Sequence, residues 1–413
     1  MWNPAIKMWH WWREEMFDSK QKSIMVDVRV PGNVEKPYKA MENVFVGFWQ
    51  AMHDAPDVPE KWLEGKYQKS FAIEVVSIEG EVHFYFRFPA ETRKNMESAV
   101  YAQFPDAEFT EVEDYTKKIP PDIPNKDWRM WGTNYRFEKP NVYPIKTYSR
   151  YFEPNATAKE EYKIDPMALL LEGLGRLGKG EQLWIQYILK PITPEDDYNY
   201  VNEGRQVVDE IVNKRLKPAT QKGPGTFTFL DDIRKVVILL LTGQEDLAGA
   251  KEAEKEDRTL RDLTPGEKDL ALAIDEKISK YAFMASVRFI YLAKEENYFS
   301  PAKAAAMQYF TQFSSQTLNK MRPLSGTLTK TNTIFTRFMD ARSTYLKKRR
   351  LFRHYTMRVP AFFPNVPSRA LLLLNTEEMA TLFRLPSKLT VPTSTLPRIE
   401  SKRGAAPPEL PFE

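Results

Sequence analysis

The sequence predicts an α+β protein made of two units of similar plan. Three observations predict it: a strand-helix-strand-strand-helix-strand order within residues 24–115, regular apolar alternation along one of those strands, and renewed alternation of strands and helices after residue 143. The first order is that of a ferredoxin-like βαββαβ domain. The second unit is expected to be ferredoxin-like or a related α/β domain, with a helical insertion at about 195–262.

The elements of the first unit follow from apolar spacing and from residues that break regular structure. Apolar residues recur at three- and four-residue steps in 39–52, which is typical of a helix packed on one side. Glu79–Gly80 is a hairpin signal, and Pro105 ends the second helix. In order, the expected elements are a strand at 24–30, a helix at 39–52, strands at 71–78 and 82–88, a helix at 91–104 and a strand at 107–113.

The strand at 82–88 has the clearest pattern, because side chains of a strand point alternately to the two faces of its sheet. One face is expected to lie in a core and the other to be polar or partly covered. The first face carries Val82, Phe84, Phe86 and Phe88, and the second carries His83, Tyr85 and Arg87.

The second unit repeats this order less completely, since one strand is not evident in it. Asp165–Pro166 predicts a helix start, with Asp as N-cap and Pro at the first helical position. Thr264 and Glu267 have the spacing of a capping box. The expected elements are a strand at 144–152, a helix at 166–177, a strand at 181–190, helices at 198–216, 229–241 and 264–279, a strand at 284–293 and a helix at 301–313.

The chain of 413 residues is long enough for two or three domains. Its apolar content of 42% is that of a folded protein, so general disorder is not expected. The expected parts are a Trp-rich N-terminal segment (1–23), a ferredoxin-like domain (24–115), a Pro-rich linker (116–142), a second α/β domain (143–320), and a basic mixed segment with an extended Pro-rich tail (321–413).

Charge and composition restrict the functional classes. The 60 basic and 56 acidic residues leave a net charge of only +4, so binding to nucleic acid or anionic lipid must come from a local patch. Cysteine is absent, which excludes disulfides, thiol catalysis and thiolate metal sites. No apolar run of the sequence approaches the roughly 18–20 residues that span a bilayer.

No motif indicates a catalytic, cofactor or metal site. Gly173–Gly178 satisfies GxGxxG, but it follows a helix and precedes a strand, the reverse of a dinucleotide site, so helix C-capping explains it better. The four histidines are scattered without metal-ligand spacing. The acidic pair Asp231–Asp232 stands at an expected helix start, where carboxylates favour the helix dipole. We therefore expect a non-enzymatic chain with no cofactor and no metal.

Two clusters remain as candidate contact surfaces. Basic and aromatic residues interleave in 347–358, a pattern that suits a nucleic-acid backbone and its bases, anionic lipid or an acidic partner; the alternative is a solvated helix face. The tryptophans near the N-terminus suit an interfacial membrane helix or a segment docked on the protein or a partner. The candidates are Lys347, Lys348, Arg349, Arg350, Arg353 and Arg358 for nucleic acid or an anionic surface, and Trp2, Trp9, Trp11 and Trp12 for a membrane interface.

Six segments spread over most of the chain carry a family resemblance. Together, and in this order, they resemble an uncharacterised bacterial family whose members carry this region ahead of a HerA/FtsK-like ATPase domain of type IV secretion and conjugative coupling proteins. The segments are VRVPGNVEKPYKAMENVF (28–45), FAIEVVSIEGEVHFYFRFP (71–89), ESAVYAQFPDAEFTEVEDY (97–115), LTPGEK (263–268), VRFIYLA (287–293) and LNTEEMATLFRLP (374–386).

The resemblance implies a non-catalytic accessory or scaffold module of a type IV secretion-like or conjugative DNA-translocation machine, cytoplasmic and peripheral at the inner face of the membrane. The family's phosphate loop has no counterpart in this sequence, so its ATP hydrolysis is not carried over. Either the HerA/FtsK-like motor ATPase, the expected partner, is encoded separately, or this chain has lost it. Transmembrane helices usual near the family's N-terminus are replaced here by the Trp-rich segment. Self-association is also expected, because ferredoxin-like units often pair. The alternative is a nucleic-acid-binding protein that uses the 347–358 cluster.

Overall fold

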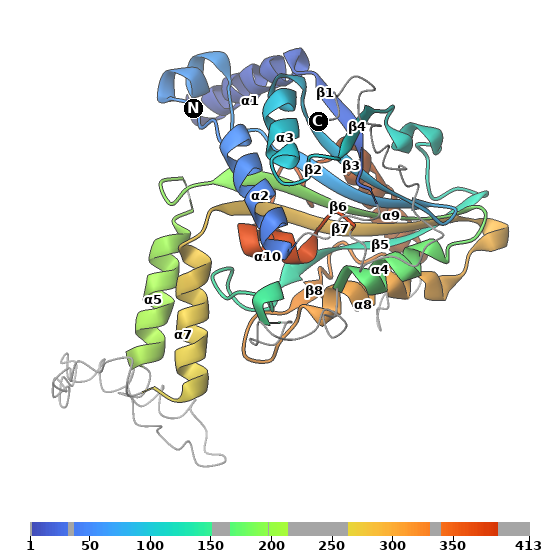
Figure 1. Ribbon diagram of the computed structural model, residues 1–413. Helices are drawn as coiled ribbons and strands as arrows, with labels where there is room; N and C mark the ends of the chain where they lie inside the picture. Colours follow the sequence, from blue (N-terminus) through green and yellow to red (C-terminus); the bar gives the residue numbers. More distant parts are fainter. Residues whose placement is uncertain are drawn as a thin grey trace, which may run out of the picture.

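The computed structural model describes residues 2–31, 37–150, 166–196, 198–213, 263–330 and 340–386. In this part of the chain nine strands form one antiparallel sheet, in the order β4-β1-β3-β2-β6-β7-β5-β8 with β9 paired to β7 (Figure 1). The strands are β1 (Ser23–Arg29), β2 (Phe71–Ile78), β3 (Glu81–Pro89), β4 (Glu108–Glu111), β5 (Trp128–Phe137), β6 (Glu181–Ile192), β7 (Ala282–Lys294), β8 (Met321–Pro323) and β9 (Leu372–Asn375).

The helices lie on both sides of this sheet and at one of its ends (Figure 1). The longer ones are α1 (Trp2–Lys20), α2 (Tyr38–Met52), α3 (Arg93–Tyr101), α4 (Pro166–Gly175), α5 (Tyr200–Asn213), α7 (Pro265–Ile278), α8 (Ala304–Gln312), α9 (Asp340–Met357) and α10 (Thr376–Leu382). Short helical turns that matter below are η1 (Glu60–Glu64) and η3 (Tyr115–Lys118).

The sheet consists of two halves with the same order of elements. In the first half β1, α2, β2, β3, α3 and β4 follow one another, and the strands lie in the order β4-β1-β3-β2. In the second half the order is β5, α4, β6, β7, α8 and β8, with α5 and α7 added between β6 and β7, and the strands lie in the order β8-β5-β7-β6. The strands β2 and β6 pair antiparallel between the halves, which makes the sheet continuous. The predicted α+β class is confirmed.

The expected linker over 116–142 is wrong, because this interval contains β5, the strand that the second unit lacked in the sequence. β5 pairs with β7 on one side and β8 on the other. Gly132 interrupts its apolar pattern for a packing reason: a Cβ there would come within 2.6 Å of the Phe289 carbonyl oxygen and 2.9 Å of a Leu351 methyl carbon. The close approach of the β5 and β7 backbones thus requires glycine at position 132, and this glycine makes β5 hard to recognise as a strand in the sequence.

The strand expected at 144–152 is also wrong over its described part. The Ile145 N–H donates to Glu378 Oε1 at 2.9 Å, and the Tyr148 N–H donates to Thr381 Oγ1 at 2.9 Å. Side chains of α10 therefore satisfy this backbone, in place of a neighbouring strand.

The other expected elements within the described residues are found with shifts of a few residues at their ends. Glu79 and Gly80 turn between β2 and β3 with φ of 54° and 92°, as their hairpin signal predicts. The Thr264 N–H donates to Glu267 Oε2 at 3.0 Å, which confirms the capping box. The helix expected at 229–241 lies outside the described residues.

The two faces of the sheet are covered unequally. The larger core lies between one face and the helices α2, α3, α4, α8 and α10, and it contains the Val82, Phe84, Phe86 and Phe88 side chains as predicted. On the opposite face α9 and the segment 115–123 cover a smaller apolar cluster. Tyr85 belongs to this second cluster, as the alternation requires.

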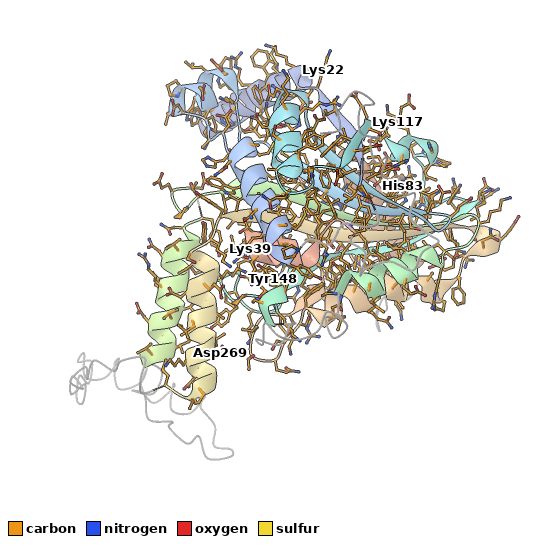
Figure 2. All side chains as sticks on the ribbon, viewed as in Figure 1. Lys22, Lys39, His83, Lys117, Tyr148 and Asp269 are labelled. Atoms are coloured by element: carbon orange, nitrogen blue, oxygen red, sulfur yellow. The ribbon has the colours of Figure 1, made fainter. Side chains whose placement is uncertain are left out.

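The helices α5 and α7 form a hairpin that projects from the sheet between β6 and β7 (Figure 1). Asp269 lies toward its outer part, whereas Tyr148 lies near the body of the molecule (Figure 2). The two helices approach closely at Gly204, where a Cβ would come within 2.6 Å of an Ile278 side-chain carbon. The expected insertion at about 195–262 therefore begins with α5, and its remainder after residue 213 lies outside the described residues.

Candidate functional site on helix α9

Helix α9 packs on the sheet through one apolar side. Leu351, Phe352 and Tyr355 are buried, and the rings of Phe352 and Tyr355 lie 6.3 and 5.4 Å from that of Trp184 on β6. The i, i+1, i+4 spacing of these residues leaves the charged residues on the remaining circumference of the helix, together with the exposed Tyr345, Leu346 and Met357. The basic cluster of the sequence therefore lies on an anchored helix.

A row of buried polar side chains crosses the sheet beneath α9. The register places Glu74 of β2 opposite Gln186 of β6, Gln186 opposite Arg288 of β7, and Arg288 opposite Asn134 of β5. All four residues are at most 1% exposed. We call this set the polar row. Buried polar groups need hydrogen-bond partners, so the bonds along the row decide how it is stabilised.

The polar row is bonded at one end and open at the other. Gln186 Nε2 donates to Glu74 Oε1 at 2.6 Å, and Arg288 Nε donates to Gln186 Oε1 at 2.6 Å. Arg288 Nη1 donates to the Val359 carbonyl at 2.8 Å. Within the described residues, however, Arg288 Nη2 and both the nitrogen and the oxygen of the Asn134 side-chain amide have no partner. The row thus ends in unsatisfied buried groups at Asn134.

Arg358 is not part of a surface cluster, and its assignment as a nucleic-acid or anionic-surface contact is wrong. It is 8% exposed, and its Nε donates to Glu74 Oε1 at 2.9 Å. Its Nη2 donates to Asp114 Oδ1 at 3.0 Å. Burial opposes ionisation of Asp114, but the Arg358 guanidinium holds the pKa of that carboxyl below its usual range. Two carboxylates therefore neutralise Arg358 inside the protein.

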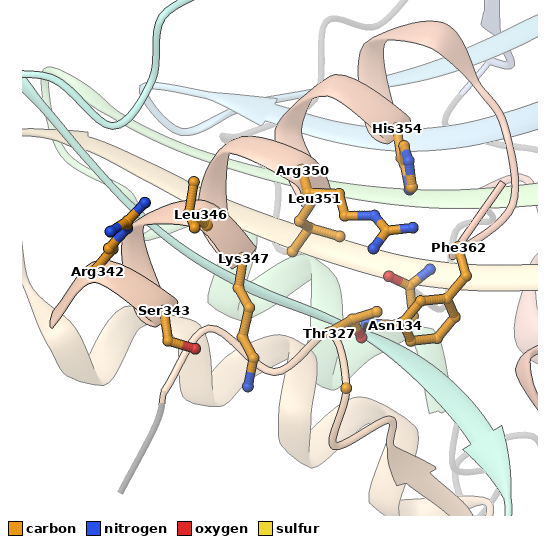
Figure 3. A pocket seen from close by; sticks show the side chains of 11 residues that line it. Asn134, Thr327, Arg342, Ser343, Leu346, Lys347, Arg350, Leu351, His354 and Phe362 are labelled. Carbon is orange, nitrogen blue, oxygen red and sulfur yellow. Dashed lines mark hydrogen bonds between the residues drawn. The ribbon is translucent and has the colours of Figure 1, made fainter. Parts of the chain in front are cut away.

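The other basic residues of the cluster occupy different sides of α9. Lys347 and Arg350 line a cavity of about 390 Å³ between α9, β5 and the loops around 326 and 362 (Figure 3). Lys348 lines a separate hollow beside Pro124. Arg349 and Arg353 are exposed and line neither of these two hollows. Among the described residues, none of these five cations forms an ion pair with a carboxylate.

The cavity, which we call the α9 pocket, combines three kinds of side chain. Arg342, Lys347 and Arg350 supply positive charge, Leu346, Leu351 and Phe362 supply apolar surface, and Asn134 and Thr327 supply hydrogen-bonding groups. In Figure 3, Arg350 extends from α9 toward Phe362, and Asn134 lies beside Phe362. Thr327 Oγ1 is occupied, since it accepts the Asn134 N–H at 3.0 Å and donates to the Leu324 carbonyl at 3.0 Å. The Asn134 amide, in contrast, has no hydrogen-bond partner for its nitrogen or its oxygen in the described part of the chain.

His354 also lines the α9 pocket. Its burial lowers its pKa to about 4, and the positive charges of Arg288, Arg350 and Arg353 act in the same direction. The imidazole is consequently neutral at physiological pH and adds no charge to the pocket.

Several cations near α9 were not singled out in the sequence. Burial lowers the pKa of Lys348, and the neighbouring charges of Arg129 on β5 and Lys303 before α8 lower it further. Arg342 contributes to the α9 pocket itself. Arg129 and Lys303 are distant from the cluster in sequence, and the unpredicted strand β5 carries Arg129, so no local pattern could have brought them together.

The N-terminal helix α1 is docked on the body and still exposes its tryptophans. The His10 and Trp62 rings lie 5.1 Å apart, and those of Phe17 and Tyr67 lie 5.7 Å apart. Arg13 also donates to the Leu63 carbonyl. Exposed fractions are 47% for Trp9, 59% for Trp11 and 47% for Trp12. The side chain of Trp2 lies outside what the structure describes.

The whole described sheet falls within one sequence family. A domain of unknown function, DUF8128, matches residues 13–391. The chain belongs to this family. No curated protein shows a significant match to the sequence. Because the matched range contains every strand from β1 to β9, the DUF8128 domain comprises both halves of the sheet together with the α9 pocket.

Other features of this DUF8128 chain can be placed within the described ranges. There, no helix is long and apolar enough to cross a membrane. In the same ranges, no three His, Asp or Glu side chains gather so that they could hold a metal ion. The glycines of Gly173–Gly178 lie in the last turn of α4 and in the turn before β6, but none has the positive φ of a C-capping glycine, so the expected C-capping is wrong; at Gly173 the reason is packing, because a Cβ there would come within 2.5 Å of the Ala305 Cβ.

Proposed function

We propose that this chain is a non-catalytic docking module for a HerA/FtsK-like motor ATPase in a type IV secretion-like or conjugative translocation machine, cytoplasmic and peripheral at the inner face of the membrane. The proposal rests on the sequence segments that resemble regions preceding such motors. In the structure, the feature that supports it is the projecting α5–α7 hairpin, because an element that leaves the body presents a surface to another protein.

We further infer that each half of the sheet is a ferredoxin-like unit. The orders β4-β1-β3-β2 and β8-β5-β7-β6 support this, since each places the first and third strands of its half in the centre. The same fold serves many unrelated activities, so it supports a scaffold role without specifying a partner.

The hairpin offers one clear apolar contact. Leu272 of α7 is 52% exposed, whereas the neighbouring Ala271 and Ala273 are buried against the rest of the protein. A leucine on another helix is exposed to a similar extent: Leu169 of α4 is 47% exposed. Leu169 therefore provides a matched control of the same residue type on a helix that does not project.

Affinity purification of the tagged chain from its native cells, after cross-linking, tests the proposal. We expect a HerA/FtsK-like ATPase among the recovered proteins. Leu272→Glu should reduce its recovery about tenfold, because a buried charge in an interface costs more than 1.4 kcal/mol. Leu169→Glu should leave recovery unchanged. The absence of any ATPase or membrane component from the wild-type sample contradicts the proposal.

We also propose nucleic-acid binding along α9 as a second candidate function. The observation that favours it is a set of five cations, Lys347, Lys348, Arg349, Arg350 and Arg353, that no described carboxylate neutralises. Such cations bind phosphates and release counterions. Lys303 extends the positive surface beyond the helix, whereas Arg129 is paired with Glu295.

Binding of a fluorescent single-stranded oligonucleotide, measured by anisotropy over a range of salt concentrations, tests this second function. We expect the logarithm of the affinity to fall linearly with the logarithm of salt concentration. Replacing the four residues Lys347 to Arg350 by alanine should abolish binding. An affinity that does not respond to salt, or that survives this replacement, contradicts the proposal.

A further inference from the structure

The α9 pocket contains a buried amide that lacks partners. Asn134 is 1% exposed and lines the pocket, and neither atom of its side-chain amide is hydrogen-bonded within the described part of the chain. Its backbone groups are satisfied, because its N–H donates to Thr327 and its carbonyl accepts from Leu324. The unpaired donor and acceptor therefore belong to a side chain that faces the cavity, and a ligand can pair with both at once.

An asparagine amide matches one ligand group particularly well. A carboxamide donates from its nitrogen and accepts at its oxygen in one plane, which is the pattern that pairs with the edge of a nucleobase such as adenine. A simple anion can accept one bond from the nitrogen but cannot donate to the oxygen. The Asn134 amide therefore favours a neutral planar group with an adjacent donor and acceptor.

The apolar side of the pocket suits the face of such a planar group. Phe362, Leu346 and Leu351 line it, and the Arg350 guanidinium carbon lies 5.4 Å from the centre of the Phe362 ring. Bases stack on aromatic rings and on arginine planes. A base bonded to Asn134 would lie near Phe362, because the two side chains are neighbours in the pocket (Figure 3).

The charged side of the pocket suits a phosphate. Arg342, Lys347 and Arg350 line it, and no carboxylate is among the described residues that do so. These three cations lie on one side of α9. Arg350 is three residues after Lys347 and eight residues, about two helical turns, after Arg342. Arginine and lysine are the usual partners of phosphate oxygens.

From this combination we propose that the α9 pocket binds a nucleoside phosphate, with the base on Asn134 and Phe362 and the phosphate on Arg350, Lys347 and Arg342. A cavity of about 390 Å³ lies in the size range of small-ligand sites. The ligand is either a free nucleotide or a nucleotide unit of a nucleic-acid strand. If the ligand is a nucleotide of a nucleic-acid strand, this inference rests on the second candidate function and specifies which cations contact the nucleotide in the pocket.

Titration calorimetry on the full chain with AMP, ribose 5-phosphate, adenosine and inorganic phosphate tests the pocket. We expect AMP to bind at least about tenfold more tightly than each of the other three, since both its base and its phosphate have partners. Arg350→Gln and Lys347→Gln should each weaken AMP binding. Arg349→Gln and Arg353→Gln, on the same helix but outside the pocket, should leave it unchanged.

Asn134→Leu tests the base contact separately. The variant should bind ribose 5-phosphate as the wild type does but lose the advantage of AMP over it. Urea denaturation of each variant verifies that it is folded. Equal affinities of the wild type for AMP and ribose 5-phosphate, or AMP binding weakened equally by Arg349→Gln and Arg350→Gln, overturn the proposal. An absence of AMP binding at millimolar concentration overturns it as well.

Competition with oligonucleotides distinguishes the two sources of the ligand and the two proposals. If the strand occupies the pocket, AMP displaces a fluorescent oligonucleotide, and Arg350→Gln weakens both ligands. If AMP binds and no oligonucleotide does, the pocket binds a free nucleotide, and the second candidate function is contradicted. If oligonucleotides bind and AMP neither binds nor displaces them, α9 contacts nucleic acid outside the pocket and this inference fails.

Discussion

Arg358 Nε donates to Glu74 Oε1 at 2.9 Å, although 284 residues separate them in the chain. The side chains are 6% and 0% exposed, so the pair lies in the interior. Tyr115 Oη donates to the other carboxylate oxygen of Glu74 at 2.7 Å and lies 2.9 Å from Tyr355 Oη of α9. This pair therefore joins the chain just after α9 to a central strand and fixes one end of the helix over the polar row.

Arg358→Met should lower the free energy of unfolding by about 3–5 kcal/mol, because it leaves the buried Glu74 carboxylate without its countercharge, whereas Asp114 keeps Arg87 Nη1 at 3.8 Å. Arg358 has a φ of 54°, and methionine would have the same backbone strain. The loss of unfolding free energy therefore measures the effect of removing the charge. Urea denaturation measures it. Arg353→Met, on an exposed site of the same helix, should change stability by less than about 0.5 kcal/mol. Equal effects of the two substitutions contradict the prediction.

A second buried ion pair holds α10 to α7. Lys277 Nζ lies 3.1 Å from Glu378 Oε2, with exposed fractions of 1% and 0%. Glu378 also accepts the N–H groups of Ile145 and Asn375. Lys277→Met should therefore cost about 3–5 kcal/mol of unfolding free energy, since Glu378 keeps its place and loses its cation.

The exposed Lys268 on the same helix provides the matched control for Lys277. Lys268→Met should change the urea midpoint little, because a surface lysine contributes within about 0.5 kcal/mol. A midpoint for Lys277→Met close to that of Lys268→Met shows that the buried pair does not stabilise the α7–α10 contact.

The pH dependence of stability should include a contribution from His354. Its pKa in the folded protein is about 4 and its ordinary value is 6.5, so between these values the unfolded chain binds more protons. The contribution is fully present above pH 6.5 and is lost as pH falls toward 4. Burial opposes its protonation first, and Arg288, Arg350 and Arg353 oppose it further. His354→Gln should lose less stability than the wild type between pH 7 and 5, measured by urea denaturation, and an equal loss contradicts this assignment.

The first half of the sheet could be predicted from sequence because its signals are local. The apolar alternation of β3, the Glu79–Gly80 turn and the apolar stripe of α2 each lie within a few residues of one another, and each specifies one element. In the second half, β5 carries Gly132 where another backbone approaches and Asn134 where the polar row ends. Glycine and asparagine both have low strand propensity. The contacts that require them at positions 132 and 134 are tertiary, so β5 could not be recognised from its local sequence.

The candidate site could be predicted only in part for the same reason. The sequence identifies Lys347 and Arg350 as cations, but their shared pocket depends on β5. It also shows Glu74, Gln186 and Arg288 as polar residues with an apolar residue on each side, a signal of a buried polar group. Their alignment into one row depends on the pairing register of strands that are far apart in the chain, and no local pattern specifies that register. Arg358 follows α9 closely in sequence, yet its carboxylate partners come from the first half.

The exposed tryptophans of α1 should bind a membrane surface. Trp9, Trp11 and Trp12 are about half exposed, and indole rings prefer the interface between lipid and water. The wild-type chain should therefore co-sediment with vesicles of phosphatidylethanolamine and phosphatidylglycerol. Replacing these tryptophans by alanine should reduce partitioning about tenfold or more, since each lost interfacial contact adds to the total.

The docking of α1 provides the control for this last prediction. The contacts of His10 with Trp62 and of Phe17 with Tyr67 involve none of the three tryptophans, so the three substitutions should leave the helix attached through them. Phe299, which is 60% exposed on another part of the surface, is a matched aromatic residue outside the helix. Phe299→Ala should co-sediment as the wild type does. Binding that survives the loss of all three tryptophans shows that the aromatic face of α1 serves a protein partner instead of a lipid surface.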